Sequence, residues 1–135
     1  MAETKPWNAA RAAEIIAAHQ AMDGPLLPML HGLQAEFGCV PADATALLAQ
    51  ALNLSQADVH GVITFYHDFR RAPAGKHVLK LCRAEACQSM GGTALGANLL
   101  SSLGIGWGET TADGVLTVEP VYCLGLCACA PAGLL

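Results

Sequence analysis

The sequence predicts an α+β protein in which an N-terminal helical bundle is followed by a smaller α/β domain. Apolar residues of the first half recur at helical spacing, whereas the second half has the pattern strand, helix, strand, strand. A break is expected at residues 72–76, where proline and glycine punctuate the chain. We therefore expect a helical domain over residues 1–74 and a second domain over residues 75–135.

The first two helices are predicted from alanine content and apolar spacing. Residues 8–22 are rich in alanine and carry Ile15 and Ile16 at their centre, before Gly24-Pro25 ends the segment. The next segment repeats its apolar residues at steps of four, three and four, which places them on one helix face. Those residues are Leu26, Leu30, Leu33 and Phe37. Gly38 follows and is expected to cap this helix.

Two further helices complete the expected bundle. Residues 43–52 predict a short third helix, and Ser55 with Asp58 forms a capping-box-like opening for a fourth. We expect the fourth helix to continue to Phe69, with cations at its C-terminus, where they suit the helix dipole. Its apolar stripe is Val59, Val62, Ile63, Tyr66 and Phe69, and the cations are Arg70 and Arg71.

The second half begins with a strand and a helix. Residues 77–81 alternate weakly in polarity and run directly into Cys82, so they predict a strand. Residues 90–103 carry leucines at helical spacing after a Gly91-Gly92 entry, which predicts a helix.

A turn and a further strand are expected after that helix. Residues 109–112 are compatible with a short strand, and Asp113-Gly114 predicts a tight turn. The last predicted strand covers residues 115–122, is interrupted at Pro120 and ends at Cys123.

Composition narrows the class of protein. Hydrophobic residues make up 53% of the chain and charged residues 13%, against about 25% charged in an average soluble domain, which excludes intrinsic disorder. The net charge of −4 argues against nucleic-acid binding. Mean hydropathy is +0.40, yet no window supplies the roughly 20 consecutive apolar residues of a membrane span. We expect a cytoplasmic protein with surface hidden against partner subunits.

The cysteines carry the most specific signal. Four of the six form two pairs, Cys82-x4-Cys87 and Cys123-x3-Cys127, and each pair follows a predicted strand. We expect all four in loops at strand ends, where their thiolates can converge on a metal site or an iron–sulfur cluster. Cys39 lies in an apolar segment and is interpreted as a small buried hydrophobe.

Spacing leaves two kinds of metal site open. Zinc sites favour Cys-x2-Cys, and the wider gaps here suit sulfurs spread over two irons, so spacing favours a [2Fe–2S] cluster. A zinc-stapled interaction domain remains the alternative. An anionic cluster also requires backbone N–H donors, which Gly91, Gly92 and Gly125 are placed to provide.

Three other features have ordinary interpretations that we prefer or cannot separate from functional ones. His60 and His67 share a helix face without a third ligand, so a core or surface role is favoured over metal binding. Trp107 is interpreted as a packing residue before a partner anchor. Arg83 either offsets the charge of a cluster or is simply solvated.

Several segments together resemble a known family. The C-terminal run from Cys123 to Pro131 reads CLGxCxxAP, and upstream stand Thr64-Phe65-Tyr66 and Pro73-x-Gly75-Lys76-His77. Over nearly the whole chain, these motifs resemble the thioredoxin-like [2Fe–2S] subunit of NADH-oxidising modules, the "24 kDa" subunit family of respiratory complex I. The resemblance implies a thioredoxin-like second domain. It also implies one [2Fe–2S] cluster whose ligands are Cys82, Cys87, Cys123 and Cys127.

Within that family, residues 59–92 are most similar to the gamma subunit of soluble NAD-dependent, molybdenum-containing formate dehydrogenase. This likeness implies an electron-transfer subunit that is non-catalytic alone. Its partners would be a subunit binding FMN and NAD and a larger iron–sulfur and molybdenum subunit that oxidises formate. The equivalent subunit of complex I or of an NAD-linked hydrogenase is the alternative.

Two departures from the family pattern stand out. Cys129 occupies a position where a polar or small residue is common, which makes it a candidate replacement ligand or a thiol beside the cluster. Family members also continue beyond the position of Leu135 with a strand and a helix, so we expect the second domain to lack those last elements.

Overall fold

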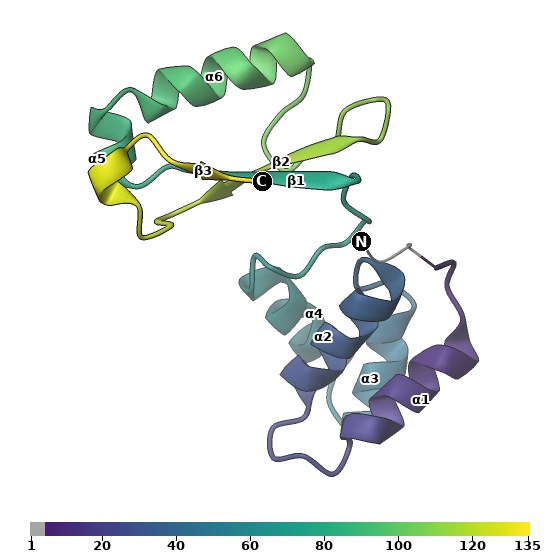
Figure 1. Ribbon diagram of the computed structural model, residues 1–135. Coiled ribbons are helices and arrows are strands. Elements are labelled where there is room, and N and C mark those ends of the chain that lie inside the picture. Colours follow the sequence, from purple (N-terminus) through teal and green to yellow (C-terminus); the bar gives the residue numbers. More distant parts are fainter. Residues whose placement is uncertain (1–4) are drawn as a thin grey trace. The chain divides into compact units, whose positions relative to one another are not determined.

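The computed structural model describes residues 5–135 and divides the chain into two compact units that meet between Pro73 and Ala74 (Figure 1). The helical unit contains α1 (Ala9–His19), α2 (Leu26–Phe37), α3 (Ala44–Leu52) and α4 (Gln56–Phe65). The second unit contains β1 (His77–Cys82), α5 (Glu85–Ser89), α6 (Gly92–Leu103), β2 (Leu116–Val121), the 3-10 turn η1 (Cys127–Cys129) and β3 (Gly133–Leu134). The predicted α+β class is confirmed.

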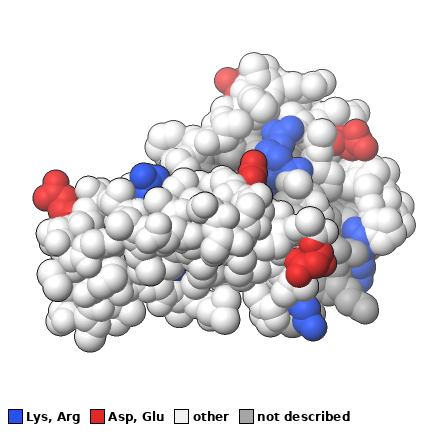
Figure 2. Space-filling view, turned by 90° about the horizontal axis from the view of Figure 1, so that it is seen from above, with Lys and Arg blue, Asp and Glu red and all other residues white. Residues whose placement is uncertain are grey.

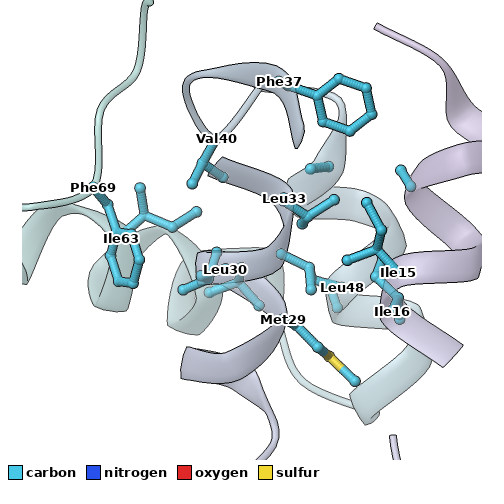
Figure 3. Close-up of a cluster of buried hydrophobic side chains, with 14 residues drawn as sticks. Ile15, Ile16, Met29, Leu30, Leu33, Phe37, Val40, Leu48, Ile63 and Phe69 are labelled. Carbon is cyan, nitrogen blue, oxygen red and sulfur yellow. The ribbon is translucent and has the colours of Figure 1, made fainter. Parts of the chain in front are cut away.

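The helical unit is built around the apolar face of α2. Leu30 and Leu33 are fully buried, and α1 contributes Ile15 and Ile16 from the side (Figure 3). α1 packs against α2 and α3, and α3 packs against α4. Burying a leucine or isoleucine side chain stabilises a fold by about 1.5–3 kcal/mol, so this shared core accounts for the stability of four short helices.

The ends of two helices follow the sequence signals. Gly38 takes the left-handed conformation, with φ 75°, at the C-terminus of α2. At the start of α4, the Ser55 hydroxyl accepts from the Asp58 N–H at 3.0 Å, and the Asp58 carboxylate accepts from the Ser55 N–H at 3.3 Å. The predicted capping box is therefore present.

Replacing the cap Ser55→Ala should lower the free energy of unfolding of the helical unit by about 1 kcal/mol, because one N–H of α4 loses its acceptor. Urea unfolding followed by far-UV circular dichroism measures the change. Gln56→Ala, at an exposed position one residue later, is the matched control and should unfold near the wild-type midpoint. Equal midpoints for both variants would contradict the role of the cap.

The prediction that α4 continues to Phe69 is wrong. The helix ends at Phe65, and Tyr66 is extended. The Gln34 side chain explains this, since it donates to the Asp68 carbonyl and accepts from the Arg70 N–H, each at 2.7 Å. These bonds tie the segment to α2 and leave Phe69 buried in the core without a helical backbone.

The sheet of the second unit has the strand order β2-β1-β3. β1 and β2 are parallel, with Cys82 opposite Val121, and β3 is antiparallel to β1. Figure 1 shows α6 along one side of this sheet. Because parallel strands end at the same edge, Cys82 and the residues that follow Val121 meet there.

Three details of this unit differ from expectation. β2 runs through Pro120 without interruption, because β2 is an edge strand and can accommodate a residue that has no N–H to donate. α5 and β3 were not predicted, since five and two residues are too short to show a periodicity. The expected strand at residues 109–112 is reduced to one bridge, between Thr110 and Thr117.

The core of the second unit is thin. Among residues 5–135, its buried apolar side chains are Cys82, Cys87, Leu100 and Val118, whereas the helical unit has a much longer series. Two of these four side chains are thiols. A large part of the interior of this small unit therefore consists of candidate ligand atoms.

The surface carries few charges. On the face drawn in Figure 2, Lys, Arg, Asp and Glu side chains stand singly or in small groups on a largely uncharged surface. Several large apolar side chains are exposed, including Phe65 at 72% and Tyr122 at 69%. No helix within residues 5–135 combines the length and apolar character that crossing a membrane requires.

Candidate metal centre

The structure brings the two cysteine pairs together at the carboxyl ends of β1 and β2. Cys82 is the last residue of β1, Cys87 lies in α5, Cys123 follows β2, and Cys127 begins η1. The expectation that all four lie in loops is therefore wrong for Cys87, which a five-residue helix holds. The thiols of Cys82 and Cys87 are hydrogen-bonded to each other, and the Cys123 and Cys127 sulfurs are 3.9 Å apart.

Backbone N–H groups join the two pairs. The Cys82 sulfur accepts from the N–H groups of Cys123 and Leu124, so the segment after β2 folds over the end of β1. The Cys87 sulfur accepts from the N–H of Ala132, near β3. Both pairs are thus parts of one site and not two separate dithiols.

The thiols influence one another's ionisation. The N–H of Ala84, followed by the other donors, lowers the pKa of Cys82 and so favours its thiolate. The neighbouring Cys82 sulfur raises the pKa of Cys87, and Cys123 does the same for Cys127. Adjacent thiolates repel one another, and a cation between them removes that repulsion.

The donor set fits a [2Fe–2S] cluster. Four thiolates, two sulfides and two ferric ions carry a net charge of −2, which backbone N–H donors stabilise. Such donors are present at Cys82 and Cys87, and the Gly125 N–H donates to the Cys123 sulfur at 3.3 Å. Cys123 itself has φ 109°, a strained value for a residue with a side chain, as is found where local geometry serves a site.

Within residues 5–135, no three His, Cys, Asp or Glu side chains are gathered closely enough to hold a single metal ion. A two-iron cluster distributes its four sulfurs over two metals, so its ligands spread more widely than those around one zinc ion.

The two pairs differ in burial. Cys82 and Cys87 are 5% and 2% exposed, whereas Cys123 and Cys127 are open to solvent. Tyr122 and Leu126, which flank Cys123 and Cys127, are exposed as well. The site is therefore closed on one side and reaches an apolar surface on the other.

The remaining cysteines lie in different surroundings. Cys39 is buried in the helical unit, and burial raises the pKa of its thiol, as expected for a small apolar residue. Cys129 ends η1 and is exposed, two residues after Cys127. His60 and His67 are also exposed, and the His60 ring contacts the Arg71 guanidinium at 3.2 Å, so both histidines are surface residues.

Arg83 and Trp107 contact each other beside the site. The Arg83 guanidinium lies over the Trp107 ring, 4.9 Å from its centroid. Trp107 is half-buried and lies so close to Gly96 of α6 that a Cβ there would approach the ring within 2.9 Å. The packing interpretation of Trp107 is therefore the better one.

The groups that sequence reasoning missed are mostly backbone atoms. The N–H groups of Ala84, Leu124 and Ala132 donate to sulfurs, and their side chains give no sign of it. Gly125 was the predicted donor that the structure does place on a sulfur.

Four converging cysteines on a small mixed sheet, held by backbone donors, define the class of iron–sulfur electron carriers. The chain belongs to the family of thioredoxin-like [2Fe–2S] ferredoxins, whose sequence model matches residues 12–135. The expected family and its cofactor, a [2Fe–2S] cluster, are confirmed.

Similar curated proteins belong to NADH-quinone oxidoreductases. In Pseudomonas aeruginosa, one component of this enzyme is 40% identical over 100 residues, which cover 74% of this chain and 60% of that protein. In Thermus thermophilus, the corresponding component is 35% identical over 106 residues, which cover 78% of this chain and 59% of that protein. The chain thus spans about three-fifths of the length of these relatives.

A solved structure supports the fold. The NAD+-reducing [NiFe]-hydrogenase in its air-oxidised state matches 81% of this chain with a TM-score of 0.64 and 30% identity. The match covers 18% of the hydrogenase chain, so there the similar fold is one part of a much longer polypeptide.

Proposed function

We propose that the chain is an electron-transfer subunit, with Cys82, Cys87, Cys123 and Cys127 as the ligands of its [2Fe–2S] cluster. The observation that supports this ligand set is the convergence of the four sulfurs within one network of backbone N–H donors. When bound, the cluster exchanges one electron at a time. The chain's own residues hold it, offset its negative charge and cover one side of it.

The exposed side of the site is the proposed path for electrons. Cys123 and Cys127 lie at the surface, and Tyr122 and Leu126 give that surface an apolar character suited to contact with a partner. The sequence carries no glycine-rich dinucleotide-binding fingerprint after a strand. We therefore assign FMN and NAD to a neighbouring subunit, which carries out the two-electron hydride chemistry.

For the parent complex we propose a cytoplasmic NAD-dependent formate dehydrogenase with a larger iron–sulfur and molybdenum subunit. The similarity of residues 59–92 to its gamma subunit supports this choice. The equivalent position in complex I or in an NAD-linked hydrogenase is the second candidate, favoured by the names of the relatives and of the solved structure.

The test is the redox spectrum of the native complex, purified through a tag on this chain. We expect visible absorption between about 300 and 600 nm that NADH bleaches, together with an EPR signal of a reduced [2Fe–2S] cluster. A colourless subunit with stoichiometric zinc would overturn the proposal. Molybdenum in the complex and reduction by formate support formate dehydrogenase, whereas nickel or quinone-dependent activity identifies the second candidate.

Cys127 and Cys129 can be separated by mutation. Cys127→Ser should lose most of the cluster, because serine oxygen is a poor substitute for a thiolate on iron, whereas Cys129→Ser should keep wild-type iron and sulfide. Iron and acid-labile sulfide per chain give the result. The reverse pattern would show that Cys129 is the ligand and that the assignment of Cys127 is wrong.

A further inference from the structure

Gly92 makes an unusually close backbone contact with Cys87. Gly92 is the first residue of α6, and a Cβ placed on it would lie 2.6 Å from the Cys87 carbonyl oxygen and 3.0 Å from its carbonyl carbon. Side-chain carbons do not approach other atoms closer than 3.0 Å. Both neighbours are backbone atoms, so they cannot rotate away as the end of a flexible side chain would.

The Cys87 backbone has little freedom to yield. α5 packs against α6, and its single turn is closed by bonds from Gln88 N–H to the Ala84 carbonyl and from Met90 N–H to the Ala86 carbonyl. Cys87 is 2% exposed, and its sulfur is held by Cys82 and by the Ala132 N–H. A shift of the Cys87 backbone therefore moves its sulfur relative to the other three.

The neighbouring Gly91 has a different requirement. It adopts φ 89°, which favours glycine, but a Cβ on it would meet no atom within 4 Å. The constraint from Cys87 falls on Gly92 alone of this glycine pair, and it is a constraint on space and not on backbone conformation.

We propose that Gly92 is a positioning residue for the cluster: its lack of a side chain lets α6 rest directly on the Cys87 backbone and sets the position of the Cys87 sulfur. The inference rests on the proposed ligand role of Cys87. A larger residue at position 92 displaces α5, so the iron bound to Cys87 meets its sulfur at an altered distance and angle.

The test compares Gly92→Ala with wild type in the full-length holoprotein. Gly92→Ala should release its cluster to an iron chelator about tenfold faster, the size of effect typical of residues that support a ligand. The EPR g values of the reduced cluster and its midpoint potential should shift as well. These two readouts report the geometry at iron and do not depend on how stable the protein is.

Leu100→Ala is the matched control. Leu100 is a buried core residue of the same helix, 8% exposed, so its truncation loosens α6 without adding an atom beside Cys87. It should lower the unfolding temperature and leave the g values and the potential unchanged. The same spectral shift in Leu100→Ala would overturn the inference, because general loosening would then explain both variants.

Two further outcomes separate the inference from the proposed function. If Cys87→Ser loses the cluster but Gly92→Ala keeps wild-type g values, potential and chelation rate, only the positioning role is wrong. If Cys87→Ser keeps the wild-type EPR signal, the ligand set itself is wrong, and the inference fails with it.

Discussion

A Cys82→Ser variant is expected to purify without its [2Fe–2S] cluster. Cys82 ends β1, contacts the Cys87 thiol, and accepts N–H groups from both sides of the site. Removing this sulfur takes away one of four iron ligands and leaves those donors facing a weaker acceptor. Absorbance between about 300 and 600 nm, with iron and sulfide per chain, measures the loss.

Cys39→Ser is the matched control for this prediction. Cys39 is also buried, at 7% exposure, but it lies in the helical unit. Its replacement places a hydroxyl in an apolar environment and should cost some stability while the cluster content stays at the wild-type level. Cluster loss in Cys39→Ser, or a full cluster in Cys82→Ser, would contradict the ligand assignment.

The second large effect concerns stability. Leu33→Ala should lower the free energy of unfolding of the helical unit by about 2–5 kcal/mol, because Leu33 is fully buried at the centre of the core and its truncation leaves a cavity. Denaturant unfolding followed by the helical signal in circular dichroism gives the value. The visible spectrum of the folded variant should be that of wild type.

Leu54→Ala is the comparison for Leu33→Ala. Leu54 is 40% exposed, so its truncation should change the unfolding free energy by no more than about 0.5 kcal/mol. Similar losses in both variants would mean that the burial of Leu33 does not determine the stability of this unit.

Sequence reasoning succeeded where a residue's own side chain makes the structural decision. The apolar stripe of α2, the Gly38 cap and the Ser55 capping box all lie within a few residues and are visible in the sequence. The end of α4 was misplaced because Gln34, more than thirty residues away, bonds to the backbone at Asp68 and Arg70. Such a bond leaves no local pattern.

The candidate site shows the same division. Two cysteine pairs after two strands could be predicted to converge, and parallel pairing of β1 with β2 brings them together. The short helix around Cys87 and the closeness of Gly92 could not be predicted, because they depend on how α5 meets α6. Donors to sulfur from Leu124 and Ala132 are backbone atoms, which any residue except proline could supply.

The thin core of the second unit has a consequence for how much of this protein a cell can keep. Two of its four buried apolar side chains are proposed ligands, so binding of the cluster adds directly to the folding free energy of this unit. Chain made without iron or sulfide should expose this half to proteases first, and a resistant fragment ending near Pro73 should accumulate on limited digestion. If apo and holo chains were digested alike, the cluster would not be a structural support. Where it is one, iron supply sets the lifetime of the subunit as well as its activity.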